Sequence, residues 1–169
     1  FPSGLPVESG AVAPPLSILS LDAAPPVRQG HDGVHATSRL VEDDETGERA
    51  LELSLDSLEN RTWVDVRIPV DLGDNDLSEY RALCLRLKRG QPVTRRIEVA
   101  LAMGEEVGYG AVVDVPAEWE EVRLPLDRLS PLWRTNVPLD LDRVIALHVG
   151  YGTYTLPNSI SGPHSVLLA

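Results

Sequence analysis

The sequence has 169 residues, a length typical of one domain with a sizeable core. Hydrophobic residues make up 43% of it and charged residues 24%, which is the balance of an ordinary globular protein. The 15 Lys and Arg residues against 26 Asp and Glu residues leave a formal net charge of −11, which argues against nucleic acids and anionic membranes as partners. No apolar run reaches the roughly 18 residues typical of a transmembrane helix. The single cysteine, Cys84, excludes an internal disulfide and a cysteine-rich zinc site.

The first 30 residues are rich in Pro, Gly, Ser and Ala and contain two pairs of adjacent prolines. Paired prolines favour extended backbone and remove hydrogen-bond donors from any sheet. We therefore predict a Pro/Gly-rich linker or arm over residues 1–15 and a single β-sandwich domain over residues 16–169. One short strand is expected at Leu16–Leu21.

From about residue 34 onwards, apolar residues alternate with polar ones in short runs separated by turn residues. The runs are Leu51–Leu55, Val64–Ile68, Leu83–Leu87, Ile97–Met103, Val107–Val115, Val122–Leu126, Ile145–Val149 and Val166–Leu168. This alternation gives each strand one core face and one solvent face, as in antiparallel sheets. We predict an all-β fold, an antiparallel β-sandwich (jelly roll) of about nine strands.

Several short motifs follow one another in a characteristic order along these strands. They are the Gly47–Leu53 run, the Trp63 strand, the Asp76–Tyr80 turn, the Trp119 strand with Leu124-Pro125-Leu126, and Asp140–Val144 before the penultimate strand. Over roughly residues 16–169 the chain resembles the galactose-binding-like β-sandwich of carbohydrate-binding modules, including modules attached to secreted polysaccharide hydrolases.

The resemblance implies a non-catalytic module that binds a polysaccharide or oligosaccharide and docks a linked catalytic domain on it. It further implies a secreted or periplasmic location and, in many such modules, a structural calcium ion. The chain departs from the family at one point. The last strand of family members often carries an aspartate, and Ser165–Ala169 contains none. The same sandwich occurs in assembly factors and other accessory domains, so the fold alone does not define the ligand.

Sugar recognition requires flat aromatic faces together with planar polar groups that bond to hydroxyl pairs. Only 5% of the residues are aromatic, and those predicted to lie in loops are the best candidates. The first candidate site comprises Trp133, Tyr151 and Tyr154, with Asn158 and His164 in the loop that follows. The glycines that Tyr151 and Tyr154 flank allow the backbone or a ligand to approach closely, although ordinary loop packing is the alternative. Trp63 and Trp119 begin predicted strands, so we expect them to pack in the core or at its edge.

A second candidate surface consists of polar residues that fall opposite the apolar positions of their strands. They are Arg86, Lys88, Arg96, Glu98, Arg123 and His148. If these strands are neighbours, the side chains form a mixed-charge groove whose arginines hold uronic acid carboxylates or sulfate esters. Of these we include Arg86, Arg96, Glu98 and His148 in the predicted carbohydrate site. A solvated face with cross-strand ion pairs is the alternative.

The acidic run Glu42-Asp43-Asp44-Glu45 offers hard oxygen ligands suited to calcium, with Glu42 and Asp44 as the candidate ligands. An acidic turn is the alternative interpretation. His31 and His35 are four residues apart but lie in a glycine-containing loop, so the spacing does not predict a zinc site.

Catalysis is the rival class of function. The sequence contains no Gly-x-Ser-x-Gly elbow, phosphate-binding loop or dinucleotide fingerprint. A small jelly-roll polysaccharide lyase or hydrolase is the runner-up, with Arg86, Arg96, His148 and Tyr151 supplying charge neutralisation and proton abstraction. A structural protein-interaction domain is the third hypothesis. The sequence favours the non-catalytic glycan-binding module.

Overall fold

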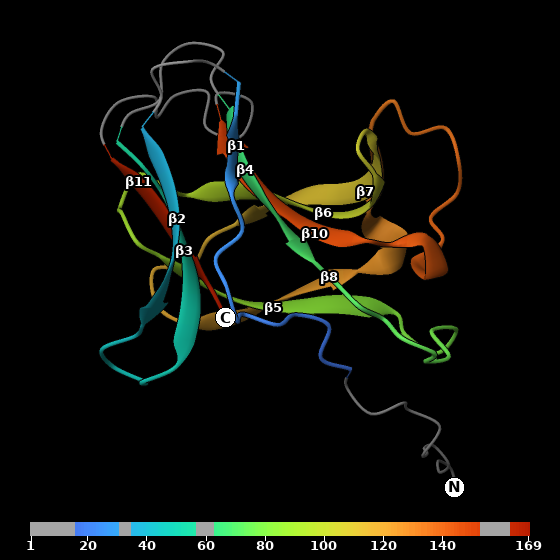
Figure 1. Cartoon of the computed structure of the whole chain (residues 1–169), viewed down its shortest axis with the longest axis horizontal. Helices are drawn as coiled ribbons and strands as arrows, with labels where there is room; N and C mark the ends of the chain where they lie inside the picture. Colours follow the sequence, from blue (N-terminus) through green and yellow to red (C-terminus); the bar gives the residue numbers. More distant parts are fainter. Residues whose placement is uncertain (1–15, 31–34, 57–62, 153–162) are drawn as a thin grey trace, which may run out of the picture.

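A computed structural model of the chain describes residues 16–30, 35–56, 63–152 and 163–169 (Figure 1). These residues contain eleven strands and two short 3-10 turns. The strands are β1 (Val27–Gln29), β2 (Ala36–Glu42), β3 (Arg49–Leu55), β4 (Trp63–Pro69), β5 (Ala82–Arg89), β6 (Arg96–Gly104), β7 (Val107–Asp114), β8 (Glu120–Pro125), β9 (Ser130–Trp133), β10 (Ala146–Gly152) and β11 (His164–Leu168). The turns are η2 (Leu126–Arg128) and η3 (Leu141–Arg143).

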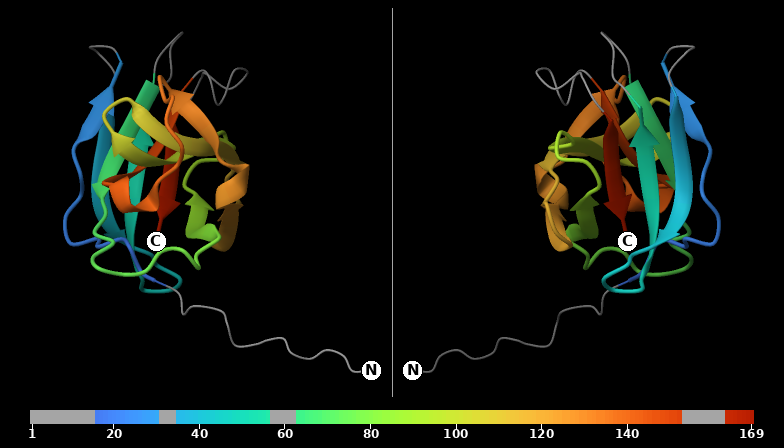
Figure 2. Two further views of the ribbon diagram at one scale, coloured as in Figure 1. Left: turned by 90° about the vertical axis from the view of Figure 1, so that its right-hand side faces the viewer. Right: turned by 90° about the vertical axis from the view of Figure 1, so that its left-hand side faces the viewer.

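The strands form two sheets that face each other (Figures 1 and 2). The six-stranded sheet has the order β1-β4-β10-β6-β7-β9, and the five-stranded sheet has the order β2-β3-β11-β5-β8. Every pairing between these strands is antiparallel. The predicted antiparallel β-sandwich is therefore confirmed. Among the described residues, no helix has the length and apolar character needed to cross a membrane.

The strand count differs from the predicted nine in four places. The strand expected at Leu16–Leu21 is reduced to a single bridge between Leu19 and Val70. Strands β1, β2 and β9 were not predicted. All three lie at sheet edges, where strands are short or tolerate breaks in the apolar pattern, such as Pro131 in β9 or the inward-facing Ser38 in β2.

The core lies between the inner faces of the two sheets and is almost wholly aliphatic. Leu87, Ile97 and Leu147 are fully buried, and Leu53 and Val166 are 1% exposed. These residues occupy every second position of their strands, as the period of two requires. The alternate positions leave each sheet with an outer face, and the two outer faces differ in character.

Ion pairs cover the outer face of the five-stranded sheet. Arg39 of β2 bonds to Glu52 of β3 at 2.6 Å, and Arg86 of β5 pairs with Glu48. The Arg86 guanidinium also lies 5.3 Å from the ring centroid of Trp119, at cation–π distance. The alternative interpretation of the polar positions, a face with cross-strand ion pairs, thus describes this sheet.

The turn of the β2–β3 hairpin is organised around the buried carboxylate of Asp43. One carboxylate oxygen accepts hydrogen bonds from the backbone N–H and the hydroxyl of Thr46, at 2.9 and 3.0 Å. The Lys88 ammonium lies 3.5 Å from Asp43 and 3.7 Å from Glu45. The Trp119 indole beside it, both Thr46 donors and the Lys88 charge hold the pKa of Asp43 well below its usual range.

We expect the substitution Asp43→Asn to lower the thermal unfolding midpoint at pH 7, because the neutral amide loses the favourable interactions of the carboxylate. A carboxyl pKa that is depressed by folding contributes stability above its unfolded value of about 4, and that contribution is lost as the pH falls below it. The difference between the two proteins should therefore narrow below about pH 4. Melting curves from pH 7 to pH 3 test this, and a constant difference would contradict it.

Candidate functional site

The outer face of the six-stranded sheet carries a groove of about 560 Å³. On β4, Trp63, Asp65 and Arg67 point outward because they alternate with buried valines and isoleucine. The register places Arg28 of β1 opposite Asp65, and His148 of β10 opposite Arg67. The residues lining the groove are Arg28, Trp63, Asp65, Arg67, Glu98, Glu105, Glu106, Trp133 and His148.

Small residues on the central strands leave room for this groove. A Cβ atom at Gly150 of β10 would lie 2.8 Å from the Cβ of Asp65. On β7, a Cβ atom at Gly108 would lie 2.6 Å from Cζ3 of Trp133, and one at Gly110 would lie 2.4 Å from the carbonyl oxygen of Val99. Because β7 has no side chain at Gly108, the edge of the Trp133 ring at Cζ3 can approach the β7 backbone closely.

A chain of charged and polar side chains forms the floor. The Arg28 guanidinium donates to both carboxylate oxygens of Asp65, at 2.8 and 3.2 Å, and this bonding raises the pKa of Arg28. Asp65 Oδ2 lies 3.9 Å from Nδ1 of His148, whose Nε2 lies 3.1 Å from Oε1 of Glu98. The side chains of Asp65 and His148 are only 4% and 3% exposed. In this nearly buried setting, the bonds from Arg28 to Asp65 and between His148 and Glu98 fix these groups in position.

Trp133 covers part of this floor from the end of β9. Its backbone has a φ of 59°, a left-handed conformation that is a genuine outlier for a bulky residue. Its ring meets the His148 ring edge to face, with centroids 5.3 Å apart and an interplanar angle of 79°. The Arg67 guanidinium lies 5.0 Å from the Trp133 centroid, and Trp133 is 41% exposed. The indole is therefore available to solvent while its position is fixed by neighbours.

Trp63 supplies a second aromatic surface, at the start of β4. It packs against Gly30, where a Cβ atom would lie 2.3 Å from the indole nitrogen. The Arg28 guanidinium lies 5.9 Å from the Trp63 ring centroid. The groove thus combines two indole surfaces with carboxylates, guanidiniums and an imidazole. Such a set can pack against apolar C–H patches and hydrogen-bond to hydroxyl groups.

The structure places some of the predicted site residues in the groove and the others elsewhere in the fold. Trp133, Glu98 and His148 do line the groove. Arg86 does not, because β5 belongs to the five-stranded sheet, so the expectation of one mixed-charge groove across all these strands is wrong. Arg96 lies on the six-stranded sheet but outside the groove lining, where its side chain is 3.4 Å from Asp114.

The prediction that Tyr151 contacts a ligand is also wrong. Strand β10 continues to Gly152, and its alternation turns Tyr151 inward, where the side chain is fully buried. Its hydroxyl donates to the carbonyl of Leu53 at 3.0 Å and approaches that of His164 at 3.4 Å, and burial raises the pKa of this phenol. His164 begins strand β11 and is buried, so it does not lie in a loop. Tyr154 and Asn158 lie outside the described residues.

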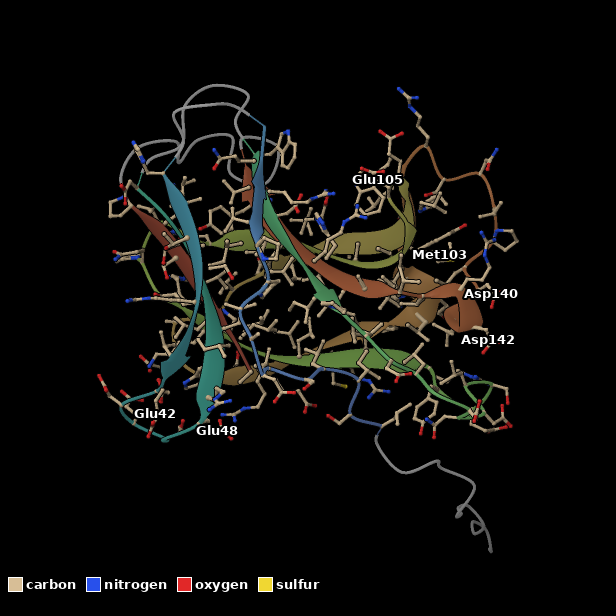
Figure 3. The ribbon with its side chains drawn as sticks, viewed as in Figure 1. Glu42, Glu48, Met103, Glu105, Asp140 and Asp142 are labelled. Atoms are coloured by element: carbon tan, nitrogen blue, oxygen red, sulfur yellow. The ribbon has the colours of Figure 1, made fainter. Side chains whose placement is uncertain are left out.

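The acidic run does not assemble a metal site in the part of the chain that the structure describes. There, no group of three or more His, Cys, Asp or Glu side chains is arranged to hold an ion. Glu42 and Asp44 are exposed at the β2–β3 hairpin, and the Lys88 ammonium already occupies the space between Asp43 and Glu45. Figure 3 shows Glu42 well away from Glu105, which lies at the groove. The assignment of Glu42 and Asp44 to a calcium ion therefore stays a prediction.

Six groove residues were missed from sequence: Arg28, Trp63, Asp65, Arg67, Glu105 and Glu106. A signal for three of them was present, since Trp63, Asp65 and Arg67 occupy the outward positions of one strand. A tryptophan at the start of a strand is typical of packing at the core edge, so Trp63 did not mark Asp65 and Arg67 on the same face as site residues. Arg28 carried no signal, because its strand has only three residues.

No protein-family model matches the sequence, and no curated protein sequence matches it. Among the solved structures that share its fold are two carbohydrate-binding modules. One is the family 11 carbohydrate-binding module of the cellulosomal cellulase Lic26A-Cel5E of Clostridium thermocellum, with a TM-score of 0.63 and 17% identity over 94% of this chain and 95% of that chain. The other is a family 11 carbohydrate-binding module from Clostridium thermocellum in complex with a β-1,3-1,4-mixed-linked tetrasaccharide, with a TM-score of 0.56 and 17% identity over 85% of this chain and 86% of that chain. Likeness at this identity shows the fold, and it confirms the carbohydrate-binding-module-like β-sandwich.

We expect Tyr151→Phe to lower the free energy of unfolding by about 1–2 kcal/mol, because it removes the donor from a buried carbonyl. Urea denaturation of the two proteins measures the loss. Arg143→Lys, at an exposed position in η3, is the control and should leave the midpoint unchanged. An unchanged midpoint for Tyr151→Phe would contradict the structural role of its hydroxyl.

Proposed function

We propose that the chain is a non-catalytic glycan-binding module whose ligand lies in the groove on the outer face of the six-stranded sheet. The observation that carries this proposal is the pairing of Trp63 and Trp133 around a hydrogen-bonding floor. The fold shared with carbohydrate-binding modules supports it as the structural context.

The chemistry of the groove suits a polyhydroxylated ligand. Sugar rings present C–H patches that pack against indole faces, and Trp133 has an exposed ring for this purpose. Carboxylates such as Glu98 accept hydrogen bonds from hydroxyl groups. The Arg28 guanidinium is already bonded to Asp65, which disfavours binding of a uronic acid carboxylate or a sulfate ester by this arginine.

The first glycan to test is a mixed-linkage β-glucan. One of the similar modules is in complex with a β-1,3-1,4-mixed-linked tetrasaccharide, and that ligand supports the choice of probe. We propose further that the module is secreted and attaches a linked catalytic domain to its polysaccharide, as the family resemblance implies.

The enzyme alternative is disfavoured by the positions of its residues. A lyase needs its neutralising arginine and its base on one accessible face. Arg86 lies on the five-stranded sheet, Tyr151 is in the core, and Arg96 stands beside Asp114 outside the groove. Only His148 of the four lines the groove, and it is nearly buried.

We therefore expect no unsaturated products when the chain is incubated with uronic polysaccharides. Chromatography of the reaction mixture would reveal any shortened products. Products that disappear in a His148→Ala variant would establish the lyase instead.

Binding is tested with a panel of polysaccharides that includes mixed-linkage β-glucan, by affinity electrophoresis. We expect retention by at least one glycan, without release of soluble products. Retention should survive a chelator, because the candidate calcium ligands Glu42 and Asp44 lie at the β2–β3 hairpin and not in the groove lining. Absence of retention across the panel would contradict the proposal and favour the protein-interaction domain.

The location of the site is tested by Trp133→Ala and Trp63→Ala. Truncating an aromatic anchor commonly costs about 2 kcal/mol or more, so we expect the affinity for the retained glycan to fall by roughly 30-fold or more for Trp133→Ala. Trp63→Ala should weaken binding as well. The matched control is Trp119→Phe on the five-stranded sheet, which should bind as the unchanged chain does. Calorimetric titration measures the glycan affinity of all three variants. If Trp133→Ala and Trp63→Ala bind as tightly as the unchanged chain, the glycan site lies outside the groove.

A further inference from the structure

The Trp133 indole contacts the His148 ring and the Arg67 guanidinium. We propose that Arg67 is a positioning residue that covers one face of the Trp133 indole and presents the other face to a sugar ring. This inference rests on the proposed function, since it assigns Arg67 a role in the same groove.

Arg67 is anchored independently of any ligand. Its Nη1 donates to the carbonyl of Gly104 at 2.9 Å and its Nη2 donates to that of Glu105 at 2.6 Å, both at the turn between β6 and β7. Two bonds from a rigid planar guanidinium fix its orientation as well as its position. Burial, followed by repulsion from Arg28, lowers the pKa of Arg67, but an arginine stays charged at neutral pH. The indole therefore meets a fixed cation.

The backbone of Trp133 requires such support. Its φ of 59° is one that residues with side chains rarely adopt. Two bonds secure the chain just beyond it, because the Thr135 hydroxyl accepts from the Gly108 N–H at 2.7 Å and donates to the Gly108 carbonyl at 3.0 Å. These two bonds hold the backbone in place two residues after Trp133. The side chain still needs a neighbour that sets its rotation, and Arg67, 5.0 Å from the ring centroid, supplies one.

The same geometry argues that Arg67 does not serve the ligand directly. Each terminal nitrogen donates one bond to a backbone carbonyl, the guanidinium lies against the indole, and Nε is buried where a ligand cannot reach it. Its effect on a glycan should therefore pass through Trp133. A lysine at this position keeps the charge, but a single ammonium on a flexible stem does not reproduce the planar fork.

The contact is tested first without ligand. Acrylamide quenching of the Trp133 fluorescence is obtained as the difference between each protein and its Trp133→Phe counterpart. We expect Arg67→Lys and Arg67→Gln to make Trp133 more accessible to the quencher and to shift its emission. The control is Arg143→Lys, in η3 outside the groove lining, which should change neither. Unchanged quenching in both Arg67 variants would overturn the inference, whatever the chain binds.

The functional consequence is tested by a double-mutant cycle with the β-1,3-1,4-mixed-linked tetrasaccharide as the probe. Loss of an ordered cation–π contact should weaken binding by Arg67→Lys roughly three- to fivefold. In a Trp133→Ala background, where Trp63 remains, the same substitution should have no further effect. An equal loss in both backgrounds would show that Arg67 touches the glycan and would overturn the inference. If the unchanged chain binds no glycan, the proposed function fails, and the quenching result alone decides the role of Arg67.

Discussion

The groove depends on the absence of side chains at two outward positions of β7. Gly108 and Gly110 lie where any Cβ would collide with Trp133, with Leu132 or with a neighbouring backbone carbonyl. Because these positions carry no side chain, the Trp133 side chain at the end of β9 can extend over β7 and place its indole beside His148. An alanine at either position would displace the indole or the strand, and the aromatic wall of the groove would be lost with it.

The two outer faces of the sandwich show how similar residue types produce different surfaces. On the five-stranded sheet, Arg86 and Lys88 are paired with carboxylates of the β2–β3 hairpin, which cover that face. On the six-stranded sheet, the charged groups of Asp65 and Glu98 are bonded within the floor and stand between two tryptophans. On the five-stranded sheet the charges pair with one another, so few polar groups remain for a ligand to bond. The six-stranded sheet leaves aromatic surface open beside groups that can accept hydrogen bonds.

Much of the fold was predictable because alternation with a period of two is a direct consequence of strand geometry. The aliphatic runs of β3, β5 and β6 alternate without interruption, and each was located from sequence to within a few residues. The edge strands were missed, because β1 is too short to show a period and β9 contains Pro131.

The site was predicted less well, and Tyr151 shows why. Its flanking glycines suggested a loop, whereas Gly150 is instead required by the close approach of β4, so the strand continues and the tyrosine turns inward. Trp133 was found because an aromatic residue in a predicted loop is conspicuous. Arg28 and Asp65 were not, since only the pairing of β1 with β4 brings them together. The pairing of distant strands is not encoded in local pattern.

The central claim is that the outer face of the six-stranded sheet binds the glycan, and chemical-shift mapping tests it most directly. The ¹⁵N-labelled chain would be titrated with the β-1,3-1,4-mixed-linked tetrasaccharide while its backbone amides and indole N–H groups are followed. We expect saturable shifts concentrated in β4, β6, β9 and β10 and at the indoles of Trp63 and Trp133. Shifts concentrated instead in β2, β3, β5 and β8, with the Trp119 indole, would place the ligand on the opposite face and contradict the claim.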